Sequence, residues 1–424
     1  MIILAALILG FDFERTRMTK EPNVLAYERI VASHPWIVGV RPAAEVMPRL
    51  KPNLILHASP PTTWNNMSAL MRGGMIGAAL YEGLARTPEE AEAKAQSGEI
   101  EFDAAQNHGA MAGGVGSITA SLPVMVVEDK SNGNISTHFL MEGLGQTLVS
   151  GAYDEGVLDR LRWFRDNFGP LLNQAIGALG GIDLRQLMAE ALMRGDELHN
   201  RNRAATSMFI NEIALGLLEV SVPRDEQRKA LRFLFENGQF FVCAVLPATA
   251  LMLQAARGIE KCSVVTAIGA NGMDCGLQLS STGERWFTAP GDVPQGVLQP
   301  NIDPQDVAPG CGDSFLAECS GFGASVLPAA PALGPVIGAS LEDGMRFAEG
   351  AYSISLGEHP HYRVPALGFR GIPVGVDARK VVERKTLPVI DIMMVHRKPG
   401  RGLVGMGIVS PPMRCFEEAV RALN

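Results

Sequence analysis

Apolar residues follow two different spacings along the chain, and the spacing changes near residue 154 and again near residue 262. Over residues 18–154, short apolar runs such as Leu54–Leu56 and Pro123–Val127 alternate with a helical stretch of small residues from Met67 to Ala85. Short apolar runs bounded by turn residues are typical of buried strands, whereas longer periodic stretches are typical of helices. This alternation predicts an α/β domain.

The middle of the chain, residues 155–262, has an almost purely helical spacing. Apolar residues recur every three or four positions in Val157–Phe164, Leu184–Met193 and Ala230–Phe235. Because few strand signals lie between these stretches, the pattern predicts a helical domain.

The last section, residues 263–424, opens with strand-like runs. These runs are Ser263–Ile268, Gly276–Ser280 and Trp286–Ala289. Asn271-Gly272 and Thr282-Gly283 separate them, and such pairs favour hairpins. We therefore predict a multi-domain chain of mixed α/β (α+β) class, in which a helical middle domain lies between two α/β domains and the second of these opens with a β meander.

Length and charge narrow the classes of partner. The chain has 424 residues, 47% of them hydrophobic and 19% charged. A chain of this length is too long for one ordinary core, and its composition is too apolar for a disordered protein. Its net charge of −8 gives no attraction to phosphate polymers, and no basic run with interleaved aromatic residues is present. We expect no nucleic-acid partner.

The cysteines and the first residues bear on the compartment. The six cysteines form no C-x-x-C pair and no Cys/His metal spacing, so we expect no metal site and a reducing, cytoplasmic location. Met1–Gly10 is apolar but too short to cross a bilayer, and charged residues follow it, so we expect no membrane association. We interpret residues 1–17 as an extension upstream of a natural start at Met18; a trimmed signal peptide is the alternative.

A histidine follows the first predicted strand. Leu54–Leu56 runs directly into His57 and Ser59, at the carboxyl end of a strand, where α/β sheets usually present their sites. A lone histidine in this place is otherwise a hydrogen-bonded turn residue.

Two glycine-rich turns are candidates for anion binding. Asn107–Ser117 contains Gly113 and Gly114, and Glu142–Gly145 is similar. Successive backbone N–H groups in such turns bind oxyanions, although a plain turn explains either sequence equally well. Neither is a dinucleotide-binding fingerprint.

The stretch Arg194–Asn202 packs seven polar or charged side chains into nine residues of the otherwise apolar helical section. Asp196 and His199 form a candidate acid/base pair three residues apart. The alternative is a solvated helix face with an ion pair between Glu197 and Arg201.

Two short segments have the pattern of a helix start. Asp313 or Ser314 is placed to cap a helix over Phe315–Glu318, and Asp377 precedes Ala378–Val382 in the same way. Free N–H groups at such a start also suit a carboxylate or phosphate, but capping alone accounts for both.

The loop His396–Gly402 gathers four ionisable bases in an acidic protein. His396, Arg397 and Arg401 are candidates for holding an anion, because charge-assisted hydrogen bonds from arginine suit phosphate and carboxylate groups. A solvated basic loop is the alternative.

Several of these segments, in the same order and spacing, resemble the AllG-like family. They are His57–Pro61, Gly195–Asn202, Gly283–Pro290, Gly312–Ser314, Gly375–Asp377, Val381–Glu383 and Pro411–Phe416. The resemblance runs from about Met18 to the C-terminus. It implies a divergent subunit of oxamate carbamoyltransferase, which in anaerobic allantoin use, a part of purine catabolism, moves a carbamoyl group from oxalurate to phosphate.

The resemblance also implies partners, and together with the residue patterns above it gives the candidate site residues. The partners are small anions (phosphate, carbamoyl phosphate and a ureido acid), an FdrA-like subunit and other carbamoyltransferase subunits in an oligomer, with no cofactor. Candidate catalytic residues are His57, Asp196, His199 and His396. Candidate substrate-binding residues are Ser59, Gly113, Gly114, Glu142, Asn200, Arg201, Asn202, Asn271, Arg285, Asp313, Ser314, Asp377, Arg397 and Arg401.

The chain departs from the family pattern at several positions that read as functional. These are Gln106-Asn107, Met141, Val149-Ser150, Ala270 and Asp391–Met393, two of which replace arginines. A different substrate, or a non-catalytic partner that shapes another subunit's site, is therefore the alternative to an active transferase subunit.

Overall fold

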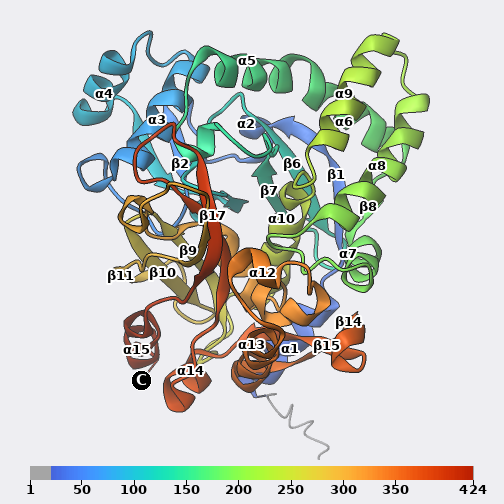
Figure 1. Ribbon diagram of the computed structural model, residues 1–424, viewed down its shortest axis with the longest axis vertical. Coiled ribbons are helices and arrows are strands. Elements are labelled where there is room, and N and C mark those ends of the chain that lie inside the picture. The colour runs from blue at the N-terminus through green and yellow to red at the C-terminus, as the bar shows by residue number, and fades with distance from the viewer. Residues whose placement is uncertain (1–20, 424) are drawn as a thin grey trace, which may run out of the picture.

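The computed structural model describes residues 21–423 and combines helices with five sheets (Figure 1). The mixed α/β class is confirmed. The predicted extension of residues 1–17 lies outside the described residues. Within them, no helix is long and apolar enough to cross a membrane.

The largest sheet has the order β4-β7-β6-β1-β8 and is antiparallel except for the pair of β4 with β7. Its strands are β1 (Pro35–Pro42), β4 (Ala110–Met111), β6 (Pro123–Asp129), β7 (Ile135–Phe139) and β8 (Ile182–Asp183). The sequence predicts β6 correctly, since Pro123–Val127 is a continuous apolar run. Most of its residues are buried, as expected for a strand covered on both faces.

Four smaller sheets complete the fold. They are β3-β2-β5 (Glu101–Ala104, Leu54–His57 and Gly116–Ile118), β11-β10-β9-β13 (Phe287–Pro290, Asp274–Leu279, Val265–Asn271 and Cys311–Gly312), β12-β17-β16 (Gln295–Leu298, Leu403–Val409 and Ile390–Val395) and β14-β15 (Ser355–Val364 and Arg370–Val376). The predicted meander is present as β9, β10 and β11. Its first hairpin turns at Gly272, whose φ of +83° is easily adopted only without a side chain.

The helices lie around and between these sheets (Figure 1). They are α1 (Pro22–Ala32), α2 (Ala43–Val46), α3 (Ala69–Glu82), α4 (Pro88–Ser97), α5 (Glu155–Trp163), α6 (Gly169–Ala178), α7 (Leu184–Met193), α8 (Arg203–Leu218), α9 (Arg224–Glu236), α10 (Val242–Gln254), α11 (Leu316–Cys319), α12 (Gly334–Ile337), α13 (Leu341–Ile354), α14 (Ala378–Arg384) and α15 (Met413–Arg421). The middle section is helical apart from the two-residue strand β8.

Helix α10 is apolar all round and is buried along nearly its whole length. A helix without a polar face must lie inside the protein. It packs against β6 and β7 of the largest sheet and against β9 of the meander. The helix therefore joins the middle section to the flanking sections in one continuous core, and its first turns reach the pocket described below.

Two loops pack closely against the glycine residues of helix α3. A Cβ at Gly73 would lie 2.6 Å from Cβ of Pro399, and one at Gly77 would lie 2.5 Å from Cδ1 of Leu148. Such distances are too short for real atoms, so these positions require glycine. The small residues of the predicted helical stretch Met67–Ala85 therefore allow this close packing.

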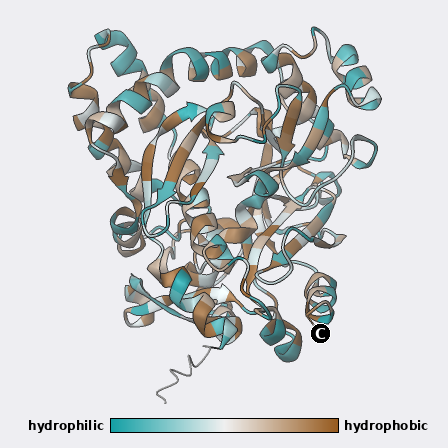
Figure 2. Ribbon diagram, turned by 180° about the vertical axis from the view of Figure 1, so that it is seen from behind, coloured by the Kyte–Doolittle hydropathy of each residue, from teal (hydrophilic) through white to brown (hydrophobic). Residues whose placement is uncertain are grey.

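Hydrophobic residues gather on the inner strands and on the central helix, while hydrophilic residues are common on the outer helices (Figure 2). The main cluster of buried apolar side chains runs from Ala26 to Ala419 and thus includes all three predicted domains. The domain boundaries themselves stay a prediction.

The two predicted caps have different outcomes. The carboxylate of Asp377 accepts the N–H of Arg379 and caps α14, as predicted. Neither Asp313 nor Ser314 caps a helix. The cap prediction is wrong there because the carboxylate of Asp313 is taken by donors from distant segments, which a local pattern does not reveal.

Candidate functional site

A pocket of about 110 Å³ lies where α10, the two glycine-rich turns and strand β16 meet. This volume suits a small metabolite, because pockets for drug-sized ligands run to roughly 300–1,000 Å³. The lining residues include no lysine and no arginine. They are Gly113, Gly114, Met141, Gly143, Leu144, Gly145, Thr147, Val149, Ser150, His199, Asn200, Val242, Leu246, Cys311, Ser314, Ile392, Met393, Val395 and Leu403.

The first glycine-rich turn forms one wall and is fixed by a buried histidine. The N–H of Gly113 donates to Nε2 of His138 across 3.2 Å. Nδ1 of His138 lies 2.6 Å from the carbonyl oxygen of Phe139, so Nδ1 carries the proton. Burial lowers the pKa of His138 to about 4, which keeps the ring neutral and Nε2 available as an acceptor.

The second glycine-rich turn is held by a buried ion pair. The carboxylate of Glu142 accepts two hydrogen bonds from Arg160, at 2.9 and 2.7 Å, and one from the N–H of Leu148. Burial raises the pKa of Glu142, and the charge of Arg160 opposes that rise. Glu142 thus anchors the turn that carries Gly143 and Gly145.

This second turn leaves donors available. Among the hydrogen bonds of the described residues, none uses the N–H groups of Gly143, Leu144 and Gly145. All three residues line the pocket and are at least partly exposed. A run of free N–H groups is a suitable site for a phosphate or carboxylate.

At the back of the pocket, one histidine meets two acids from distant parts of the chain. Nδ1 of His199 lies 2.8 Å from Oε1 of Glu318 and 3.0 Å from Oδ1 of Asp391. Both acids are fully buried, whereas His199 lines the pocket. Because Nδ1 is engaged, Nε2 is the ring nitrogen left for a ligand.

Burial and charge act in opposite directions in this group. Burial alone would lower the pKa of His199, but the charges and hydrogen bonds of Glu318 and Asp391 outweigh it and raise the pKa well above its usual value. Burial raises the pKa of Glu318 to about 7. It also raises the pKa of Glu197, with the charge of Asp391 adding to the effect.

Two further polar groups point to ligand recognition. Nδ2 of Asn200 donates to Oδ1 of Asp391 across 2.7 Å, which leaves Oδ1 of Asn200 as an acceptor at the pocket wall. Ser314 also lines the pocket, and no hydrogen bond of its hydroxyl is found among the described residues. An amide acceptor beside a hydroxyl suits a ligand that has both N–H and C=O groups.

The run Arg194–Asn202 is not a solvated helix face. It is an irregular segment after α7, in which Glu197 accepts the N–H groups of His199 and Arg201 with its two carboxylate oxygens. Asp196 accepts the N–H of Ala205 rather than pairing with His199. The predicted pairing is wrong because the segment is not helical, so a spacing of three residues does not bring the side chains together.

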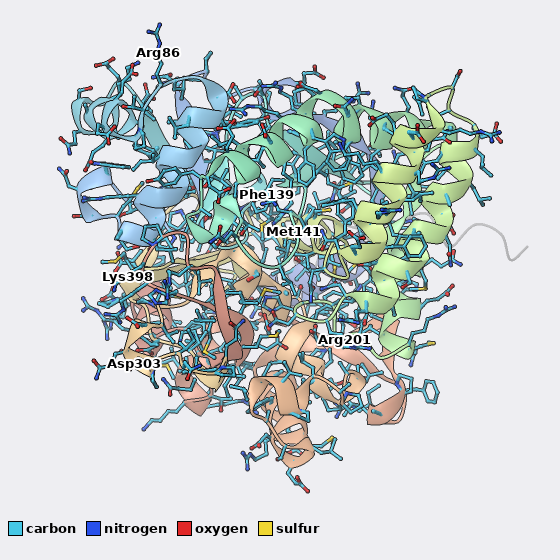
Figure 3. The ribbon with its side chains drawn as sticks, turned by 45° about the horizontal axis from the view of Figure 1, so that its top comes forward. Arg86, Phe139, Met141, Arg201, Asp303 and Lys398 are labelled. Atoms are coloured by element: carbon cyan, nitrogen blue, oxygen red, sulfur yellow. The ribbon has the colours of Figure 1, made fainter. Side chains whose placement is uncertain are left out.

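The basic loop borders the pocket without lining it. The side chain of Gln146 donates to the carbonyl oxygen of Gly400, and the flanking residues Val395 and Leu403 do line the pocket. Arg397 and Arg401 are exposed, and Nη2 of Arg397 donates to the carbonyl oxygen of Val307. Figure 3 shows Met141 near the centre and Lys398 of this loop at the periphery.

His396 of the basic loop is buried. Its Nδ1 accepts the N–H of Lys398, and its Nε2 lies 3.6 Å from a carboxylate oxygen of Asp306. The loop is therefore fixed to its own neighbours, with its cationic groups directed outward.

The other predicted residues lie outside the pocket lining. His57 is buried at the end of β2 with Nδ1 2.7 Å from the carbonyl oxygen of Ala58, and burial lowers its pKa. The N–H of Ser59 donates to Asp313, which also accepts the N–H of Ala112 and thereby supports the first glycine-rich turn from behind.

Five more predicted residues have structural contacts. Asn271 donates to the carbonyl oxygen of Pro60 and accepts two N–H groups of its own hairpin. Asn202 donates to the carbonyl oxygen of His199, and Arg201 to that of Gly195. Arg285 lies over the ring of Phe287 and is exposed. Asp377 is the cap of α14.

Sequence reasoning missed His138 and Glu318 as parts of the candidate site, and it marked Asp391 only as a departure from the family pattern. An acid inside the apolar run Leu316–Cys319 is a signal for Glu318, because a lone buried charge requires a partner. Several positions marked as departures from the family pattern line the pocket. They are Met141, Val149, Ser150, Ile392 and Met393.

Comparison with known proteins gives consistent matches over nearly the whole chain. The sequence profile of a family described as oxamate carbamoyltransferase subunit AllG matches residues 100–314. The chain is 34% identical over 407 residues to the oxamate carbamoyltransferase subunit AllG of Escherichia coli (strain K12), covering 95% of this chain and 97% of that protein.

Two further relatives have no assigned function. The chain is 37% identical over 398 residues to the uncharacterized protein YahG of the same strain, covering 94% of this chain and 84% of that protein. A crystal structure of a conserved protein of unknown function from Enterococcus faecalis V583 superposes with a TM-score of 0.93, at 34% identity and with 95% and 96% of the two chains covered.

Proposed function

Since the chain belongs to the AllG family of oxamate carbamoyltransferase subunits, we propose that it takes part in carbamoyl transfer between a ureido acid such as oxalurate and phosphate. The observation that carries the proposal is the pocket in which His199, Asn200 and Ser314 surround a space of metabolite size, beside a run of free N–H groups.

The reaction makes defined demands on a site. An oxygen of phosphate attacks the terminal carbamoyl carbon of oxalurate, the carbonyl oxygen becomes an oxyanion, and the C–N bond to the oxamate nitrogen breaks. That nitrogen takes up the proton that phosphate loses, so the products are oxamate and carbamoyl phosphate. The site must hold two anions together and stabilise the oxyanion.

The pocket residues match these demands. The N–H groups of Gly143, Leu144 and Gly145 supply donors for an anionic group. Oδ1 of Asn200 accepts an N–H of the carbamoyl group, and Nε2 of His199 donates to its carbonyl oxygen. Preorganised donors aimed at a developing oxyanion contribute more to catalysis than most other single features of a site.

The proposal also includes the partner subunits, the source of the substrate and the location of the chain. An FdrA-like protein and other transferase subunits complete the enzyme as an oligomer, and allantoin breakdown supplies the substrate. Six buried free cysteines support a reducing, cytoplasmic location. The basic loop His396–Gly402 at the pocket border draws anions toward the entrance.

The test is a reconstitution. The chain is co-purified with an FdrA-like subunit and its neighbours, and carbamoyl phosphate formed from oxalurate and phosphate is measured by coupling to carbamate kinase. We expect product only when this chain is present and little from this chain alone. Absence of product from the complete complex, with oxalurate and with related ureido acids, would refute the proposal.

A further inference from the structure

Buried carboxylates outnumber cations at the back of the pocket. The carboxylates belong to Asp196, Glu197, Glu318 and Asp391. Among the described residues, the cationic partners in contact with them are His199 and Arg201, the latter 3.5 Å from Asp196. Uncompensated negative charge in a protein interior is costly, so four acids against two bases require a further positive charge or further protons.

Two carboxylate oxygens of this group have no partner. Oε2 of Glu318 and Oδ2 of Asp391 are both fully buried and have no hydrogen-bond partner. An ionised carboxylate needs donors or a cation at both of its oxygens, and none of the described residues donates to either of these two. The two unpartnered oxygens thus indicate a missing electropositive group beside Glu318 and Asp391.

The ligand atoms converge as a metal site requires. One ligand atom from each of His199, Glu318 and Asp391 lies within 4.8 Å of the other two, and the three residues are buried. Nδ1 of His199 lies 2.8 Å from Oε1 of Glu318 and 3.0 Å from Oδ1 of Asp391. Metal bonds to such atoms are roughly 2.0–2.2 Å long, so a shared ion needs only small shifts of these side chains. The hydrogen bond from Asn200 to Asp391 and the N–H of Asp391 donating to Glu318 fix both carboxylates, as outer contacts of metal ligands commonly do.

We propose that His199, Glu318 and Asp391 bind one divalent transition-metal ion. One imidazole and two carboxylates suit Mn²⁺ or Zn²⁺. The ion replaces the proton between Nδ1 and the acids, and its charge balances the two carboxylates. The site goes beyond the proposed function, since neither partner subunits nor substrate are needed to form it.

The site also bears on the pocket. His199 and Asn200 line it, so the ion lies directly behind the pocket wall. The lining has no lysine and no arginine, and the ion supplies positive charge close to the place where an anionic substrate would bind. Coordination through Nδ1 also fixes the proton on Nε2, which keeps His199 a donor toward the pocket.

Metal binding is tested on the purified, tag-free chain. The protein is treated with EDTA, freed of the chelator and titrated with MnCl₂, with free Mn²⁺ counted by electron paramagnetic resonance, and with ZnCl₂ by calorimetry. We expect one saturable ion per chain and a higher melting temperature when the ion is bound. Glu318→Gln and Asp391→Asn should each weaken binding at least tenfold.

The control is Asp313→Asn, which alters a buried carboxylate outside the group and should leave the affinity unchanged. If both ligand variants fail to fold, Co²⁺ added to the wild type decides, because coordination by these groups produces visible absorption bands that excess Zn²⁺ removes. Absence of a bound ion in the wild type, or equal binding by folded Glu318→Gln and Asp391→Asn, would overturn the proposal. Neither result depends on carbamoyl transfer.

Discussion

Lowering the pH should destabilise the folded protein through His138. This ring is buried beside the pocket, its Nδ1 donates to the carbonyl oxygen of Phe139, and its Nε2 accepts the N–H of Gly113. A proton on Nε2 removes that acceptor and places a charge in the core. We therefore combine a pH change with the variant His138→Gln. The amide oxygen of glutamine can still accept a hydrogen bond, but the amide does not titrate.

The magnitude follows from the pKa values of the two states. The unfolded chain takes up this proton near the ordinary pKa of 6.5, and the folded protein only near a pKa of about 4. Between these values the unfolded state holds more protons, so stability is complete above pH 6.5 and is lost as the pH falls toward 4. The full loss is about 3.4 kcal/mol, and the part between pH 7.5 and 5.0 is about 2 kcal/mol.

The assay is the free energy of unfolding from urea titrations at pH 7.5 and 5.0. We expect the decrease on acidification to be about 2 kcal/mol smaller in His138→Gln than in the wild type. Thr137→Val, a change at a buried neighbour on the same strand, is the control and should keep the pH dependence of the wild type. An equal decrease in His138→Gln and the wild type would refute the reasoning.

Two further predictions concern the loops around the pocket. Arg160→Ala leaves Glu142 buried without its partner and should lower the free energy of unfolding in urea by about 3 kcal/mol. The control Arg162→Ala, on the same helix but with exposed partners, should lower it by less than about 1 kcal/mol. Equal losses would contradict the role of the buried pair. In Arg397→Ala, about tenfold more phosphate should be needed for the same rise in melting temperature. The melting temperature without phosphate should stay nearly unchanged, and Arg86→Ala, at another exposed arginine, is the control. If the melting temperature of Arg397→Ala falls sharply without phosphate while the stabilisation by phosphate stays intact, Arg397 stabilises the fold and does not bind the anion.

Local patterns predicted much of the fold. The helix expected over Leu184–Met193 is α7 with the same bounds, because its apolar residues keep helical spacing and Asp183 caps its start. The turn at Asn271-Gly272 predicted the hairpin of β9 and β10 because glycine there adopts a left-handed conformation. These features depend on residues within a few positions of one another.

The site depends on contacts that no local pattern contains. His199 reaches Glu318, 119 positions away, and Gly113 is held by His138. The basic loop has the composition of an anion site, but charge alone does not tell which way Arg397 points. The sequence therefore pointed to His199, which lines the pocket, whereas its contacts with Glu318 and Asp391 became visible only in three dimensions.

The central claim is that carbamoyl transfer takes place in the pocket of this chain. The most direct measurement compares kcat/KM for carbamoyl phosphate formation by complexes that contain Asn200→Ala or Asn211→Ala. Asn200 lines the pocket, whereas Asn211 is exposed on α8. We predict a fall of at least tenfold for Asn200→Ala, from the lost hydrogen bond to the carbamoyl group, and no change for Asn211→Ala. Wild-type activity in the Asn200→Ala complex would contradict the claim and mark the chain as a non-catalytic partner.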